Sequence, residues 1–361
     1  MKFLLIFCIL SIVLINVKCQ YEVKQLNVLF RHGERTPDFF YPALPYTIKD
    51  FYPYGIGGLT NKGKSRAFEF GQFLREKYNS FLDTTYIPEE VESISSNFGR
   101  TKMTLQLVLA GLYPPNVNQT WNKNLNWQPI PTNYNDRTKD NIFQRRHICS
   151  KYLQERENVI KSPELAPKIA SFKNLMNNMT ILTGINITDL EHLYSLYANF
   201  VALQRMNFVL PNWTHNIFPE GQLYDAMIMN LKVQNYNDLI KKIHGGGIVR
   251  TMLENMQKSV TLEDNEIKSK INLYSGHDVN ILALLSSLNL VEAHLPEFTS
   301  AVIIELLSLE EKYYVKIWYY TGIQSNLTEL TIPNCSSPCS FKTFIQATKN
   351  IIPSDEEFKC I

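Results

Sequence analysis

The stretch EVKQLNVLFRHGERTP at residues 22–37 decides the fold of this 361-residue chain. Its first nine residues favour a strand and become continuously apolar from Val28 to Phe30. This pattern predicts a strand over 22–30 that enters a buried sheet. Arg31-His32-Gly33 then interrupts the apolar run. We therefore expect charged side chains directly beyond the carboxyl end of a buried strand.

Further strands and helices alternate along the chain. Thr60 is suited to cap a helix that ends near Tyr78, with Ala67, Phe70 and Leu74 on one face. The other expected elements are strands at 91–96, 271–274, 301–307 and 313–319, and helices at 97–112 and 279–288. The alternation predicts a layered α/β/α sandwich around a mostly parallel sheet, with ligands beyond the carboxyl ends of the strands.

The middle of the chain, residues 121–236, is polar and rich in asparagine, and its pattern is largely helical. We interpret it as an inserted, mainly α-helical cap. The α/β core would then comprise residues 20–120 and 237–361. About 340 residues are enough for one large domain with such an insertion.

Residues 1–19 have the pattern of a secretory signal peptide: Lys2, a 15-residue apolar run and a cleavable end at Cys19. Its removal takes Lys2 and Lys18 from the 36 basic residues, which leaves 34 basic against 34 acidic residues. A neutral mature chain argues against nucleic-acid binding and polybasic membrane docking, because both require a positive field. The most apolar later segment, 279–290, is too short to cross a bilayer, so no membrane anchor is expected.

Four cysteines remain after the leader. The short spacing of Cys335 and Cys339 favours a local disulfide, which leaves Cys149 to pair with Cys360. A zinc site is the rival interpretation, but no histidine lies near the first pair and a secreted chain favours oxidation. The chain also has six N-glycosylation sequons, at Asn118, Asn178, Asn186, Asn212, Asn326 and Asn334. Together these features predict a secreted protein or one in the lysosomal lumen.

Three predicted strand ends carry residues suited to phosphate chemistry. These residues are Arg31, His32 and Arg35 after the first strand, Arg100 after the second, and His277 with Asp278 after the third. Arginine binds phosphate oxygens in a bidentate way and keeps its charge, and helix N-termini add backbone N–H donors. A neutral imidazole can attack phosphorus, while a protonated carboxyl can supply the proton of the leaving group.

The motif Arg31-His32-Gly33-x-Arg35-x-Pro37, with the later His277-Asp278, resembles that of the histidine acid phosphatases. The similarity extends to the segments 58–63 and 100–114 and to the cysteine layout, and it is weakest in the middle of the chain. It implies a histidine phosphatase-like fold and a phosphomonoesterase with an acidic pH optimum. It also implies that no metal or other cofactor is needed, because the arginines neutralise the phosphate.

The resemblance further implies a role for each residue of the site. His32 would be the nucleophile that becomes phosphohistidine, and Asp278 would protonate the leaving alcohol and then assist water. The residues that hold the phosphate oxygens would be Arg31, Arg35, Arg100 and His277. Gly33 is expected to permit a tight turn that aims His32. Arg66, where many relatives have glutamine, is expected on a helix surface.

Two other functions compete with this interpretation. One is a specialist phytase or inositol-phosphate phosphatase of the same fold, and the other is a secreted glycoprotein that binds phosphorylated ligands without turnover. Expected substrates are small phosphomonoesters or phosphoproteins, and a homodimer is an expectation because relatives often dimerise. The remaining histidines have no ligand spacing and are expected to be structural or exposed: His147, His192, His215, His244 and His294.

Overall fold

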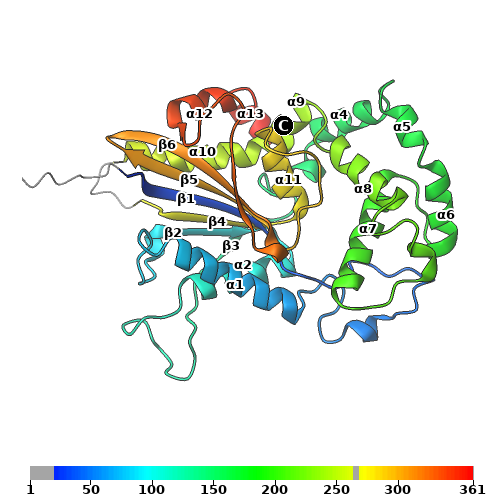
Figure 1. The fold of residues 1–361 in the computed structure, drawn as a ribbon, viewed down its shortest axis with the longest axis horizontal. Coiled ribbons are helices and arrows are strands. Elements are labelled where there is room, and N and C mark those ends of the chain that lie inside the picture. Colours follow the sequence, from blue (N-terminus) through cyan, green and yellow to red (C-terminus); the bar gives the residue numbers. More distant parts are fainter. Residues whose placement is uncertain (1–19, 263–267, 361) are drawn as a thin grey trace, which may run out of the picture.

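An eight-stranded sheet runs through the part of the chain that the computed structural model describes, residues 20–262 and 268–360 (Figure 1). The predicted leader, residues 1–19, lies outside the described residues. The strands lie in the order β3-β2-β4-β1-β5-β6-β7, and β8 pairs with β6. Their bounds are β1 Glu22–Arg31, β2 Val91–Ser95, β3 Asn133–Tyr134, β4 Ile271–Gly276, β5 Ala301–Leu309, β6 Lys312–Tyr320, β7 Leu327–Leu330 and β8 Cys339–Ser340.

The two halves of the sheet differ in strand direction. β3, β2, β4 and β1 are parallel to one another, whereas β5 pairs with β1, and β6, β7 and β8 pair further along, in antiparallel fashion. Parallel pairing is therefore confined to the half that contains the first three predicted strands. β1 lies at the junction, where it pairs with β4 on one side and β5 on the other. It is buried from both sides, which explains its continuous apolar run.

Helices cover both faces of the sheet, and this confirms the predicted α/β/α layers (Figure 1). Helix α1 (Asn61–Lys77) begins at the predicted cap, where the Thr60 side chain accepts a hydrogen bond from the Gly63 N–H. It packs with α2 (Gly99–Leu112) against Leu26 and Val28 of β1. Leu29 points to the opposite face, because successive strand residues alternate. That face is covered by α10 (Gly246–Thr261), α11 (Asp278–Ser287) and α12 (Phe341–Thr348).

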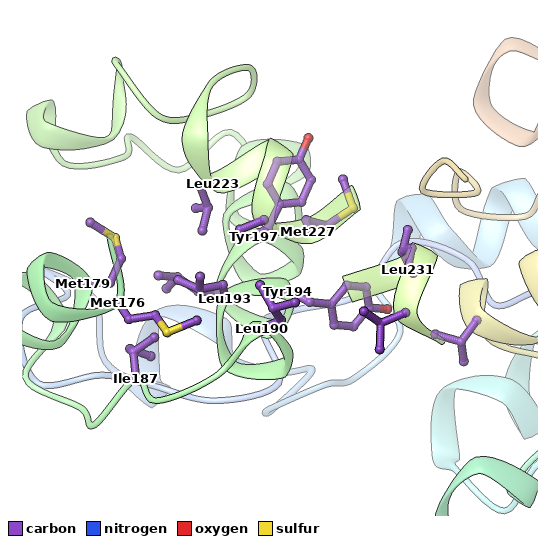
Figure 2. Packing of buried hydrophobic residues seen from close by; sticks show 14 of the residues in the cluster. Met176, Met179, Ile187, Leu190, Leu193, Tyr194, Tyr197, Leu223, Met227 and Leu231 are labelled. Atoms are coloured by element: carbon purple, nitrogen blue, oxygen red, sulfur yellow. The ribbon is translucent and has the colours of Figure 1, made fainter. Parts of the chain in front are cut away.

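The middle of the chain is mostly helical and has its own buried cluster of apolar side chains. Its helices are α3 Arg145–Ile148, α4 Ser150–Ile160, α5 Ala166–Ala170, α6 Lys173–Thr183, α7 Leu190–Arg205, α8 Gln222–Val233 and α9 Asp238–His244. Leu193 of α7, Leu223 of α8 and Met179 of α6 meet in this cluster (Figure 2). The first part of the predicted insertion differs from expectation, because residues 121–144 contain turns and β3, which extends the sheet beside β2. The exact bounds of a cap at 121–236 stay a prediction.

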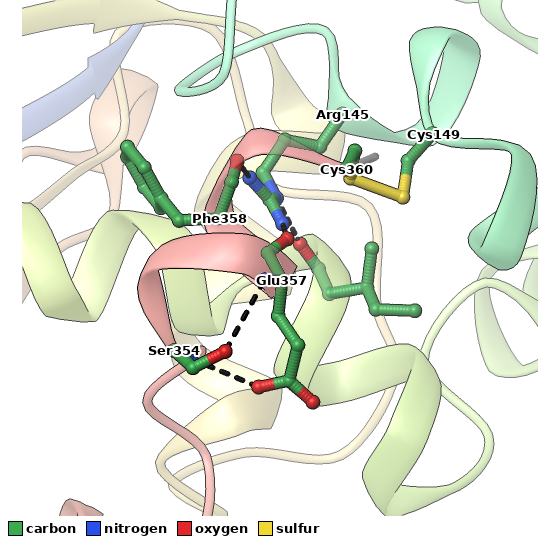
Figure 3. Close-up of a disulfide and its surroundings, with 7 residues drawn as sticks. Arg145, Cys149, Ser354, Glu357, Phe358 and Cys360 are labelled. Carbon is green, nitrogen blue, oxygen red and sulfur yellow. Dashed lines mark hydrogen bonds between the residues drawn. A yellow bond between two sulfur atoms is a disulfide. The ribbon is translucent and has the colours of Figure 1, made fainter.

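The C-terminal helix α13 (Asp355–Lys359) is held against α3 and α9 (Figure 3). A disulfide joins Cys149 to Cys360. Beside it, the buried Arg145 guanidinium donates to the carbonyl of Phe358 at 2.6 Å and that of Glu357 at 2.8 Å. Arg145 also donates to the carbonyl of Ile243 in α9. This one side chain of α3 therefore joins α3 to both α9 and α13.

A second disulfide joins Cys335 to Cys339, so both pairs are those that the loop spacing favoured. All six sequon asparagines have exposed side chains. Among the helices of the described residues, none has the length and apolar character needed to cross a membrane.

Candidate active site

The predicted phosphate-binding residues meet because three neighbouring parallel strands end at the same edge of the sheet. Arg31 at the end of β1 is in register with Gly276 of β4, and Ser95 of β2 is in register with Ser275. Two backbone hydrogen bonds extend this alignment past the strands: His32 N–H to the Gly276 carbonyl at 3.1 Å, and Ser96 N–H to the Ser275 carbonyl at 3.0 Å. One pocket is consequently lined by all six residues: Arg31, His32, Arg35, Arg100, His277 and Asp278.

A glycine is needed at position 33 because two chain segments approach closely there. The expected reason, a tight turn, is wrong. Its backbone is not in the left-handed region. A Cβ atom at Gly33 would lie 2.3 Å from the carbonyl oxygen of Gly63, in the first turn of α1. That helix docks directly on the motif, since Thr60 N–H donates to the Glu34 carbonyl at 2.9 Å. Gly33 therefore lets α1 pack against the loop that carries His32.

Arg66 also differs from expectation. Its Nε donates to Oε1 of Glu34 at 2.9 Å, and the Glu34 side chain is only 1% exposed. A buried carboxylate requires a partner of opposite charge. Arg66 supplies this partner from α1, so it supports the motif and is not an isolated surface residue.

His32 is held as a neutral imidazole with Nε2 directed at an arginine. Nδ1 lies 2.8 Å from the Gly33 carbonyl oxygen, which can only accept a hydrogen bond, so Nδ1 carries the proton. Nε2 is then an acceptor and receives a hydrogen bond from Arg100 Nε at 3.0 Å. Burial, followed by the charges of Arg100 and Arg31, lowers the pKa of His32 well below its ordinary value. The Nε2 lone pair is therefore available at acidic pH.

Asp278 is buried and fully engaged at the start of α11. Its Oδ2 lies 2.8 Å from Arg31 Nη2, and its Oδ1 accepts from the Tyr194 hydroxyl at 2.9 Å and from Val279 N–H at 2.8 Å. Burial alone would raise the pKa of Asp278, but Arg31, His277 and the Tyr194 hydrogen bond outweigh it and lower the pKa below its usual range. This environment thus favours the ionised carboxylate.

His277 precedes Asp278 at the start of α11 and also lines the pocket. Its Nε2 lies 2.9 Å from Ser96 Oγ, and its ring stands edge-on to Phe98 with 4.9 Å between the ring centroids. Burial and then the charge of Arg100 lower the pKa of His277 well below its ordinary value. A neutral His277 can donate one hydrogen bond to a phosphate oxygen without adding positive charge.

Arg35 and Arg100 share one carboxylate that we did not single out from the sequence. Asp38 Oδ2 lies 2.7 Å from Arg35 Nη2, and Asp38 Oδ1 lies 3.2 Å from Arg100 Nη1. Burial lowers the pKa of Arg100 to about 10, which still leaves the guanidinium charged at acidic pH. Within the described residues, the buried Nε atoms of Arg31 and Arg35 have no hydrogen-bond partner. Unused guanidinium donors in a cationic pocket are suited to a tetrahedral anion.

The helical middle of the chain forms the other wall of the pocket, and sequence reasoning missed these residues. Helix α7 contributes four residues at helical spacing, Glu191, Tyr194, Ser195 and Ala198, and the segment around α3 contributes Phe143, Gln144, Arg146 and His147. The i, i+3, i+4, i+7 pattern on α7 indicates a common face. It does not indicate which part of the molecule that face contacts. The sequence therefore predicts a shared face on α7 but not its position in the pocket wall.

His147 is therefore not simply structural or exposed, as expected, but lines the pocket, where burial lowers its pKa to about 4. The other four histidines that were expected to be structural or exposed lie outside this pocket. His192 and His215 are exposed, and His244 is buried. His294 lies 3.0 Å from the Tyr319 hydroxyl. In residues 20–262 and 268–360, no group of three His, Cys, Asp or Glu side chains is arranged to hold a metal ion.

The chain matches known proteins over most of its length. The model of the "Histidine phosphatase superfamily (branch 2)" matches residues 22–320. The venom acid phosphatase of Apis mellifera is 43% identical over 355 residues, which cover 98% of this chain and 91% of that protein. The prostatic acid phosphatase of Homo sapiens is 28% identical over 345 residues, which cover 94% of this chain and 88% of that protein.

A solved structure gives a further comparison. The Hafnia alvei phytase in complex with tartrate superposes with a TM-score of 0.68 over 94% of this chain and 98% of that chain. Its sequence identity is 17%, so the likeness concerns the fold.

Proposed function

The chain belongs to branch 2 of the histidine phosphatase superfamily and is a phosphomonoester hydrolase of the acid phosphatase type, and we propose that it acts through a covalent phosphohistidine on His32. One observation carries this proposal: the lone pair of a neutral, buried His32 Nε2 lies among three arginines, with Arg100 Nε at 3.0 Å. A phosphate group bound by these arginines would lie within reach of Nε2.

The first half of the reaction transfers the phosphoryl group to the enzyme. As phosphate oxygens take up the N–H donors of the arginines, Arg100 exchanges its hydrogen bond to Nε2 for one to the substrate. The Nε2–phosphorus bond forms while the bond from phosphorus to the alcohol oxygen breaks, and Asp278 gives its proton to that oxygen. The arginines and His277 stabilise the charge on the three remaining phosphate oxygens.

The second half restores the enzyme. Asp278, now a carboxylate, accepts a proton from a water molecule, and the water oxygen attacks phosphorus. The Nε2–phosphorus bond breaks, so inorganic phosphate leaves and His32 returns to its neutral form. Throughout, the hydrogen bond from Nδ1 to the Gly33 carbonyl holds the ring in one tautomer.

An acidic optimum follows from the protonation of Asp278. Arg31 chiefly holds its pKa low, against the opposing effect of burial. A bound phosphate adds negative charge beside Asp278 and shares Arg31, and both effects raise the pKa of the carboxyl group. The reactive complex then needs one proton on Asp278, which low pH supplies.

Small phosphomonoesters or phosphoproteins are the proposed substrates, and the secretory pathway is the proposed route. Two disulfides, six exposed sequon asparagines and the leader pattern at residues 1–19 support secretion or a lysosomal location. The relatives compared above include a venom and a prostatic acid phosphatase, and a further relative is the lysosomal acid phosphatase of Rattus norvegicus, which is 29% identical over 369 residues.

Alkaline-quench trapping tests the mechanism, because the phosphorus–nitrogen bond of phosphohistidine hydrolyses in acid and survives in alkali. The purified chain is mixed with a ³²P-labelled aryl phosphate, quenched within milliseconds and digested, and the labelled peptide is mapped. We expect the label on His32, and both label and turnover to be absent in His32→Ala. His192→Ala, an exposed histidine on α7, is the matched control and keeps both. A label on another residue, or normal turnover in His32→Ala, would refute the phosphohistidine mechanism.

A further inference from the structure

Asp38 occupies an unusual position for an acidic residue in a phosphate site. Its two carboxylate oxygens contact Arg35 at 2.7 Å and Arg100 at 3.2 Å, so it bridges two of the proposed phosphate-binding arginines. Its side chain is 40% exposed, whereas those of Arg35 and Arg100 are 5% and 14% exposed. Asp38 therefore lies at the mouth of the pocket and the arginines lie inside.

The position of Asp38 is fixed by the wall opposite the motif. Its N–H donates to Oδ1 of Asn199 at 2.9 Å, and Nδ2 of Asn199 donates to the Phe39 carbonyl at 3.0 Å. Asn199 lies on α7 and is completely buried. A buried amide that binds the backbone on both sides of one peptide unit holds the loop in place, so the Asp38 carboxylate is not a freely moving surface group.

Charged groups in the pocket are arranged by sign. Four arginines and three carboxylates line it, namely Arg31, Arg35, Arg100 and Arg146 with Asp38, Glu191 and Asp278. The arginine side chains are 2% to 15% exposed, whereas the two most exposed charged side chains are the acids Asp38 and Glu191, at 40% and 34%. The pocket is thus basic in its depth, with the Asp38 carboxylate at its entrance, whereas the Glu191 carboxylate is held by Arg146, Asn230 and Gln234.

This arrangement admits one phosphate group readily and a second one poorly. A single phosphate can reach the arginines, but an additional phosphate on the same substrate would remain near the entrance. There it would face the carboxylate of Asp38, and each pocket arginine is already paired or engaged with the first phosphate. Like charges at short distance in a partly desolvated site repel strongly.

We propose that Asp38 is a specificity-determining residue that selects phosphate monoesters with an uncharged or cationic alcohol and discriminates against polyphosphorylated substrates. This inference rests on the proposed phosphomonoesterase function and narrows its substrate class. It also separates this chain from a phytase, which the fold alone does not.

The test compares substrates that differ in charge beyond the reacting phosphate. p-Nitrophenyl phosphate has an uncharged leaving group, phosphocholine carries a cation, and inositol hexakisphosphate carries many additional anions. For each enzyme, kcat/KM for inositol hexakisphosphate is divided by that for p-nitrophenyl phosphate. Removing one unit charge with Asp38→Asn should raise this ratio about tenfold. It should lower the relative kcat/KM for phosphocholine.

Two further variants separate charge from structure. Asp38→Glu keeps the charge and should leave the ratio close to that of the wild type. Glu22→Gln removes the same charge at the opposite end of β1, where Glu22 contacts Lys24, and should not change the ratio. An unchanged ratio in Asp38→Asn, with equal losses on every substrate, would overturn the inference, because Asp38 would then only hold the arginines in place.

A binding measurement keeps this inference distinct from the proposed function. Calorimetry in a His32→Ala background, which should not turn over, gives the affinities for inorganic phosphate and for inositol hexakisphosphate with Asp38 intact and with Asp38→Asn. A wild type that fails to hydrolyse p-nitrophenyl phosphate would refute the proposed function. The inference on Asp38 would still be supported if Asp38→Asn tightened the hexakisphosphate affinity relative to phosphate, and overturned if the two affinities changed equally.

Discussion

Replacing Tyr194 by phenylalanine should shift the pH dependence of catalysis towards higher pH. The Tyr194 hydroxyl donates to Asp278 Oδ1 at 2.9 Å, and burial together with Asp278 raises the pKa of Tyr194 well above its ordinary value, so it stays a donor. A hydrogen bond to an ionised group contributes about 1.5 to 3 kcal/mol. Since 1.36 kcal/mol corresponds to about one pKa unit, its loss should raise the pKa of Asp278 by about one to two units.

The sign follows from which form of Asp278 the hydrogen bond stabilises. Tyr194 stabilises the carboxylate, so Tyr194→Phe favours the protonated acid and lets it persist to higher pH. Profiles of kcat/KM against pH are measured with an aryl phosphate and with an alkyl phosphate, whose poor leaving group depends more on the acid. The falling limb should move up by about one unit or more.

Tyr197→Phe is the matched control for this variant. It lies one turn further along α7, and its hydroxyl donates to the Pro219 carbonyl at 3.1 Å, away from Asp278. Its profile should superpose on that of the wild type. If Tyr194→Phe merely lowered the rate by one factor at every pH, Tyr194 would not act through the protonation of Asp278, and the argument from this hydrogen bond would fail.

Two further predictions concern the packing that supports the site. Gly33→Ala places a Cβ 2.3 Å from the Gly63 carbonyl oxygen and should lower the free energy of unfolding by about 1 to 3 kcal/mol in urea titrations. Gly99→Ala is the control, because its Cβ would have nothing within 4 Å, and it should be neutral or stabilising. An equal loss of stability in both variants would contradict the steric reason. Replacing Cys149 and Cys360 by serine opens a loop with a sequence separation of 211 and should cost about 2 to 5 kcal/mol in the same titration. The short-loop disulfide, with a separation of 4, should cost much less, and the reverse order would contradict this reasoning.

Helix α7 connects several of these expectations. It supplies Tyr194 to the proposed general acid and Asn199 to the loop that carries Asp38. Glu191 of the same helix pairs with Arg146 at 3.1 Å in the pocket wall. In the proposed mechanism, the helical middle of the chain thus tunes both protonation and charge selection, while the strand ends supply the reacting groups.

Local patterns in the sequence predicted the strands β1, β2, β4, β5 and β6 and the helices α1, α2 and α11, but not the short strands β3, β7 and β8. The apolar run before Arg31 predicts a strand buried on both faces, and Thr60 predicts the start of α1, because strand burial and helix capping depend on residues near one another in the chain. The same locality explains why the short Cys335–Cys339 loop could be paired from spacing alone. The grouping of His32 with Asp278 additionally needed the resemblance to a known family.

Other features depend on contacts between distant segments, and only the folded chain decides them. Gly33 has no positive φ. The reason why no side chain fits at position 33 is the close contact with Gly63 of α1, which only the folded chain shows. In the sequence, Asp38 is an acidic residue of a loop, and only the structure places it between Arg35 and Arg100. Tyr194 has the pattern of a core aromatic residue, and only the structure brings its hydroxyl to Asp278. Amino-acid order encodes which residues can form strands, caps and phosphate ligands, whereas charge pairing and close packing arise from distances in space, which no local pattern specifies.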